Sequence, residues 1–178
     1  MLARGVQNPD LFNLQQQQYN IMAEDYQRSH MGNEFPLQDF AQRAYQMRLN
    51  NETNIITKNN HWRDELKCME RYKMAISRQF ISDSGEMIQE WYFRHDKIQD
   101  FFMVQTFFGV GNDRLEKHIS DPRFRGVYLL LATLLPLNIA MQLRETLIQY
   151  AAKTQDHSLS DTFVQLLAKQ QKQTMLSS

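Results

Sequence analysis

The sequence predicts an all-α protein, and two observations lead to that prediction. Only 6 glycines and 4 prolines occur among the 178 residues, and they lie where a helix would begin, end or bend. Between them, apolar residues recur every three or four positions, whereas the alternation of a β-strand is hard to find. We therefore expect an irregular helical bundle of about six or seven helices around an apolar central helix, preceded by an amide-rich N-terminal helical arm.

Two helices are expected in the first third of the chain. Asn8, Pro9 and Asp10 have the residue types of an N-cap, a first helical position and a favourable first-turn acid, so a helix begins here and fades near residues 30–32. Pro36 repeats this opening, and helical apolar spacing then continues as far as the polar residues after Leu49.

Residues 1–60 are unusually rich in amides, with eighteen Asn and Gln side chains. The apolar faces of the two helices are therefore narrow, and such helices gain most of their stability by docking. We interpret residues 1–60 as an arm that docks on partners and residues 61–178 as the helical bundle domain. An ordinary helical hairpin of the same domain is an equally open alternative for the first segment.

Two longer helices are expected next. Apolar spacing predicts one helix over residues 62–80, and Asp83 with Glu86 resembles a capping box that begins a second helix. The second helix continues to about residue 108, where the glycines at 109 and 111 end it. The short connection predicts that the two helices form an antiparallel hairpin.

An apolar stretch, Val127–Met141, dominates the C-terminal part. Pro136 lies inside it, so we expect either a kinked helix over about residues 122–152 or two helices that meet at Leu135. A short helix near residues 113–119 precedes the stretch, and a last helix capped by Ser158 or Ser160 follows it.

The apolar stretch favours a buried position. It has about 15 residues, whereas a transmembrane helix needs about 20. A helix that is apolar on all sides is usually the centre of a bundle, and we expect that role here. Insertion into a membrane and burial in an oligomer interface are the alternatives.

Chemical signatures are missing from the sequence. The single Cys68 excludes an intrachain disulfide, and no spacing places two metal ligands on one helix face. We therefore expect no metal, no cofactor and no enzymatic activity. If a catalytic site exists, His95, Asp96 and Tyr92 are its first candidates, although a histidine among aromatic residues is more often simply packed.

The charges are balanced, with 20 basic and 20 acidic residues, so there is no global attraction to nucleic acid or to anionic lipid. A basic group on the helix predicted over residues 62–80 is diluted by acids, which is typical of a solvated face. The residues of this group are Arg63, Lys67, Arg71, Lys73 and Arg78. Nucleic-acid binding is a weaker alternative.

The expected function is that of a non-enzymatic structural or assembly subunit of a larger multiprotein complex, such as a virion or a secretion apparatus. The N-terminus lacks a secretory signal pattern, so we expect cytoplasmic synthesis followed by incorporation into a larger particle or complex. Protein partners or self-association follow from this hypothesis. We expect aromatic side chains of the arm to be exposed and to bind these partners. They are Tyr19, Tyr26, Phe35, Phe40 and Tyr45.

Overall fold

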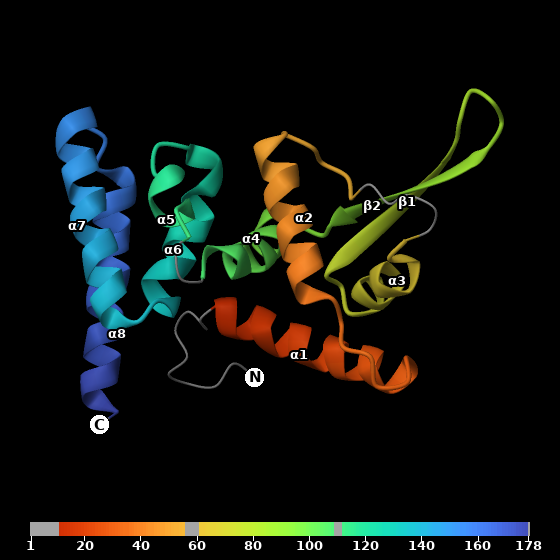
Figure 1. Cartoon of the computed structure of the whole chain (residues 1–178), viewed down its shortest axis with the longest axis horizontal. Helices are drawn as coiled ribbons and strands as arrows, with labels where there is room; N and C mark the ends of the chain where they lie inside the picture. Colours follow the sequence, from red (N-terminus) through yellow and green to blue (C-terminus); the bar gives the residue numbers. More distant parts are fainter. Residues whose placement is uncertain (1–10, 56–60, 109–111, 178) are drawn as a thin grey trace, which may run out of the picture. The chain divides into compact units, whose positions relative to one another are not determined.

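The computed structural model describes residues 11–55, 61–108 and 112–177. Within these residues the chain is mostly helical and contains one two-stranded sheet (Figure 1). Contacts divide the chain into two compact units, Met1–Phe102 (unit 1) and Met103–Ser178 (unit 2). This division lies well after residue 60, where the sequence predicted the end of an arm.

The first two predicted helices are confirmed. Helix α1 spans Leu11–Ser29 and α2 spans Leu37–Leu49. The start of the first helix at residues 8–10 lies outside the described residues. Gly32 adopts φ 86° after α1, and its N–H donates to the Gln27 carbonyl at 2.9 Å. Glycine accepts this left-handed conformation without strain, which explains why α1 ends here.

Aromatic side chains form the core of unit 1, and they come from both ends of its sequence. Tyr19 of α1 and Phe40 of α2 are buried, as is Phe102 of helix α4 (Asp96–Val104). The ring centroids of Tyr19 and Phe102 lie 6.0 Å apart, and those of Phe40 and Phe102 lie 6.3 Å apart. The narrow apolar faces of α1 and α2 are enough to hold these helices in the core, because each aromatic ring buries a large area. Residues 11–55 are therefore part of this core.

The prediction of two long helices between residues 62 and 108 is wrong. Helix α3 spans only Arg63–Arg71, and the chain then forms two antiparallel strands, β1 (Ala75–Ile81) and β2 (Met87–Phe93). A short 3-10 turn, η1 (Gln105–Phe107), follows α4. The glycines at 109 and 111, which were expected to end the second helix, lie outside the described residues.

A hairpin turn stands where the sequence suggested a helix cap. The Ser82 N–H donates to the Glu86 carbonyl at 2.8 Å, and the Ser82 hydroxyl accepts the Glu86 N–H at 3.1 Å. Gly85 adopts φ 83°, the left-handed conformation that a three-residue hairpin loop requires near its end. The Asp-Ser-Gly sequence is thus a turn signal, and the Asp83–Glu86 pattern is not a capping box.

All regular secondary structure in the described residues of unit 2 is helical. Helix α5 spans Arg114–Lys117, and a 3-10 turn, η2 (Pro122–Phe124), leads into α6 (Arg125–Leu134). Helices α7 (Leu137–Thr154) and α8 (Ser158–Leu176) complete it, and α8 packs against both α6 and α7.

The apolar stretch is divided at Pro136 into the ends of α6 and α7. Leu135 has ψ 146°, the extended conformation that a following proline imposes. The two-helix prediction is therefore confirmed. Val127 and Leu131 of α6 are fully buried, so this part of the stretch supplies the core of unit 2. Among the described residues, no helix has the length and the apolarity needed to cross a membrane.

One buried ion pair joins α2 to α4. Arg48 Nη2 lies 3.2 Å from Asp100 Oδ1, and both side chains are largely shielded from water. Burial raises the pKa of Asp100 from its ordinary value of 3.8 to about 6, and the charge of Arg48 opposes this rise only in part. The carboxyl therefore takes up a proton at a higher pH in the folded chain than in the unfolded chain.

This shift predicts a pH-dependent stability. Between about pH 4 and pH 6 the folded state binds the Asp100 proton and the unfolded state has lost it, so the contribution of Asp100 to the free energy of unfolding falls as the pH rises. The fall amounts to about 3 kcal/mol at most. Denaturant unfolding at several pH values, compared with Asp100→Asn, measures it. We expect the variant to lose this slope, and parallel curves for the two proteins would contradict the assignment.

Candidate functional site

The aromatic residues expected to bind partners are buried in unit 1. Tyr19, Tyr26, Phe35, Phe40 and Tyr45 are at most 8% exposed, so the expectation that they form an open surface is wrong. The Tyr26 hydroxyl donates to Glu65 Oε1 at 2.8 Å. Burial raises the pKa of Tyr19 and of Tyr26 to about 12, so both phenols stay protonated at neutral pH. Their role in partner binding stays a prediction, and their position is that of core residues.

Two neighbouring segments of unit 1 carry the candidate catalytic residues. Tyr92 lies on β2, and its hydroxyl donates to Glu90. His95 and Asp96 are exposed at the start of α4. Within the described residues, there is no group of three or more His, Cys, Asp or Glu side chains that could hold a metal ion.

Helix α3 carries Cys68 and part of the basic group. Cys68 is buried, and burial raises the pKa of its thiol. The five basic residues expected on one helix do not share it, because Arg78 lies on β1 and Lys73 lies between α3 and β1. In addition, Arg71 Nη2 lies 3.5 Å from Oδ2 of Asp25 on α1. The expectation that one helix carries all five basic residues is therefore wrong.

The hairpin of β1 and β2 is anchored at its base. Ala75 pairs with Phe93, and both are buried together with Trp91. The Ile55 N–H donates to the Trp91 carbonyl at 2.6 Å, which fixes the free edge of β2 at this level. The base of the hairpin is therefore part of the core of unit 1.

The middle of the hairpin is polar on both faces. Arg78 pairs with Glu90 on one face, and Gln79 pairs with Gln89 on the other. The Arg78 guanidinium carbon lies 5.3 Å from the centre of the Tyr92 ring, a cation–π distance. This polar belt separates the buried base from the end of the hairpin.

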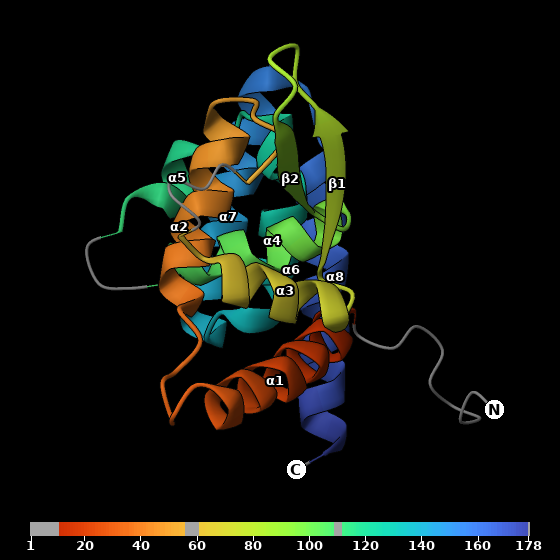
Figure 2. The same ribbon diagram turned by 90° about the vertical axis from the view of Figure 1, so that its right-hand side faces the viewer.

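The end of the hairpin is apolar again, and it is exposed. Phe80 pairs with Ile88, and Ile81 pairs with Met87. The exposed fractions of these four side chains are 43%, 37%, 68% and 66% in that order. Both views of the structure show the turn extending beyond the helices of unit 1 (Figures 1 and 2). We call these four residues the hairpin tip.

The hairpin tip is apolar on both of its faces. Opposite residues of an antiparallel pair share one face and successive residues alternate, so Phe80 and Ile88 point to one side and Ile81 and Met87 to the other. Because apolar side chains point from both faces, a binding partner shields all four of them from water only if it contacts both faces of the tip. Exposed apolar groups that gather in one place mark a binding surface more often than isolated ones do.

Sequence reasoning missed the hairpin tip because it assigned Phe80 and Ile88 to the apolar faces of two helices. One signal was available. Two apolar pairs, Phe80–Ile81 and Met87–Ile88, stand symmetrically around the Asp-Ser-Gly turn. That arrangement is typical of a hairpin whose end is apolar on both faces.

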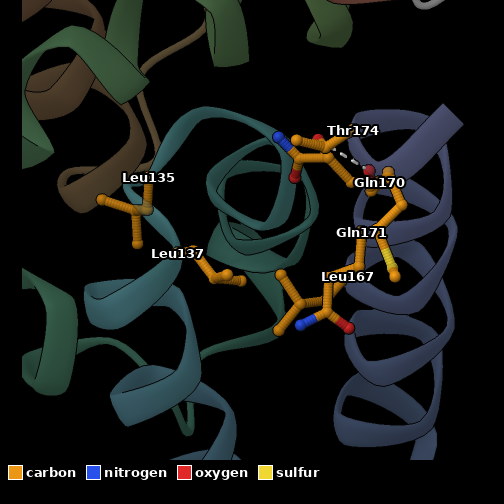
Figure 3. A pocket seen from close by; sticks show the side chains of 7 residues that line it. Leu135, Leu137, Leu167, Gln170, Gln171 and Thr174 are labelled. Atoms are coloured by element: carbon orange, nitrogen blue, oxygen red, sulfur yellow. Dashed lines mark hydrogen bonds between the residues drawn. The ribbon is translucent and has the colours of Figure 1, made fainter. Parts of the chain in front are cut away.

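Unit 2 carries a second exposed apolar feature, a groove of about 370 Å³ between the start of α7 and the C-terminal half of α8. Figure 3 shows Leu137 and Leu167 extending toward the same space. Leu137 is 54% exposed and Met175 is 78% exposed, so the groove is open to solvent. Its main lining residues are Leu135, Leu137, Leu167, Gln170, Gln171 and Met175.

Comparisons with family models, with curated proteins and with solved structures found no match for this chain.

We expect the hairpin tip to be dispensable for folding, which a matched pair of isoleucines tests. Ile81→Ser should change the free energy of unfolding by less than about 1 kcal/mol, because Ile81 already faces water. Ile55→Ser should cost more than about 3 kcal/mol, because Ile55 is 2% exposed and a hydroxyl would be buried in its place. Denaturant unfolding measures both. Equal losses would show that the tip is part of the core.

Proposed function

We propose that this protein is a non-enzymatic structural subunit of a multiprotein assembly and that the hairpin tip is its contact with a neighbouring protein. The single observation that supports this most is the exposure of Phe80, Ile81, Met87 and Ile88 on both faces of one hairpin. The kind of assembly, such as a virion or a secretion apparatus, stays a prediction from composition.

The pattern along the hairpin suits a protein interface. Interfaces combine an apolar centre with a polar rim, and here the apolar tip is followed directly by the belt of Arg78, Gln79, Gln89 and Glu90. Full burial of a large apolar side chain contributes about 1.5–3 kcal/mol. The four side chains of the tip are 37–68% exposed, so covering them with a partner supplies part of that free energy for each of them. The anchored base adds rigidity, which lowers the entropy lost on binding.

Charges at the turn favour a protein partner over the two other hypotheses. Asp83 and Glu86 are both exposed at the very end of the hairpin. A membrane would have to receive these two carboxylates before the apolar side chains, and that transfer is costly. Nucleic-acid phosphates would be repelled by the same two charges.

Photo-cross-linking tests the proposal in cells that make the protein naturally. A photoreactive amino acid placed at Ile81 should capture a discrete protein, since this side chain is 68% exposed and enters the proposed contact. The control carries the same amino acid at Gln17, an exposed position on α1. Mass spectrometry identifies the products. If position 81 captures no more protein than position 17, the hairpin tip is not a contact site.

A further inference from the structure

Unit 1 also carries a pocket between α1 and the segment that leads into α2. It has a volume of about 360 Å³, which lies in the range of binding sites for small molecules. Tyr19 and Ala23 of α1 supply apolar surface on one side, and Phe35 and Leu37 supply it on the other. The rings of Tyr19 and Phe35 are buried and pack edge to face, with their centroids 5.8 Å apart. The floor of the pocket is therefore part of the core.

Hydrogen bonds at the end of α1 hold the two sides of this pocket together. The Gly32 N–H donates to the Gln27 carbonyl at 2.9 Å, and Nε2 of the Gln27 side chain donates to the Gly32 carbonyl at 3.2 Å. Gln27 also lines the pocket, and with Nε2 used in this way its Oε1 remains as an acceptor. A pocket whose shape is fixed before binding loses less entropy when a ligand enters.

The Tyr19 hydroxyl points to a ligand. Tyr19 is only 8% exposed, and within the described residues its hydroxyl has no hydrogen-bond partner. Buried phenols normally have one. The oxygen is still in reach of solvent, because it is not among the described side-chain atoms that are sealed from water without a partner. It therefore opens into the pocket that Tyr19 lines. The charge of Glu34 adds to the rise of the Tyr19 pKa, so this carboxylate lies near the phenol.

Two carboxylates give the pocket a negative charge. Glu24 of α1 and Glu34 both line it, both are exposed, and no basic residue is among its described lining residues. Neither glutamate forms an ion pair with another described residue. The cations that reach this part of α1 are used elsewhere, because Arg28 and Arg71 both approach Asp25. The pocket therefore lacks a counter-charge of its own.

We propose that this pocket binds an aliphatic diamine or polyamine. An ammonium group donates three hydrogen bonds and accepts none, and the carboxylates, the Tyr19 oxygen and Gln27 Oε1 are all able to accept. The methylene chain between two ammonium groups suits the apolar floor of Phe35 and Leu37. Two separate carboxylates favour a ligand with two positive charges over a ligand with one. The site shares no residue with the hairpin tip, so this inference goes beyond the proposed function and does not depend on it.

Titration of the ¹⁵N-labelled full chain with cadaverine, followed through its amide chemical shifts, tests this inference. We expect saturable shifts that concentrate on residues 19–27 and 34–37. Pentylamine, which has one ammonium group, should bind at least about threefold more weakly, and the uncharged diol of the same length should cause no saturable shift. Equal binding of pentylamine and cadaverine would mean that the pocket takes a single ammonium group, and this would overturn the diamine assignment.

A matched pair of double variants separates the pocket from the overall charge of the protein. Glu24→Gln combined with Glu34→Gln should weaken cadaverine binding at least about fivefold, because both charges are lost while the side chains keep their size. Asp83→Asn combined with Glu86→Gln removes two exposed carboxylates from the hairpin turn and should change the affinity less than about twofold at about 0.1 M salt. Equal losses in the two variants would show that cadaverine senses only net charge, and this would overturn the site.

Tyr19→Phe tests the hydroxyl while keeping the ring in the core. The affinity for cadaverine should fall about threefold, because one acceptor is lost. Tyr26→Phe is the matched control, since Tyr26 is also buried on α1 but its hydroxyl already donates to Glu65. An unchanged affinity for Tyr19→Phe, or an equal fall in both variants, would overturn the role of this hydroxyl and with it the assignment of the pocket.

Discussion

The packing of unit 1 depends on the contacts that the Phe102 ring makes with other aromatic rings. Its centroid lies 6.0 Å from that of Tyr19, 6.3 Å from Phe40 and 5.4 Å from Phe93, so one side chain joins α1, α2, β2 and α4. Phe101 stands beside it, nearly perpendicular, at 5.5 Å. Edge-to-face aromatic contacts of this kind add to the free energy gained by burial.

This aromatic cluster also determines where the hairpin is held. Phe93 is the last residue of β2 and lies in the cluster, while Ile55 fixes the same strand from its other edge through Trp91. The base of the hairpin is thus held at Phe93 and at Trp91, and the polar belt in the middle of the hairpin stays in contact with water. The apolar side chains of the tip are therefore presented at a defined place, although they contribute little to the core themselves.

Local signals explain which parts of the fold the sequence could predict. The ends of α1 and α2 and the break at Pro136 follow from glycine and proline geometry, which acts within a few residues. The predominance of helix follows from apolar spacing. The two strands were missed because Trp62, Phe80 and Ile88 happen to satisfy a helical period, and because the short Asp-Ser-Gly turn signal was interpreted as a helix cap. Pairing between strands is a tertiary contact that such spacing does not encode.

The candidate site was harder to predict than the fold. Exposure depends on what packs against a side chain, and the aromatic residues of α1 and α2 looked free only because Phe101 and Phe102 lie far away in sequence. Conversely, Phe80 and Ile88 looked like core residues. Sequence reasoning identified an unusual density of apolar and aromatic groups, and the packing decides which of them face water.

The separation of the hairpin tip from the core has a consequence for how this protein can evolve. Substitutions in a core are restricted by stability, but Phe80, Ile81, Met87 and Ile88 lie beyond the polar belt and are free of that restriction. The side chains of the tip can therefore be substituted one at a time while the chain keeps its fold. Related chains with the same fold can therefore differ most at the end of this one hairpin.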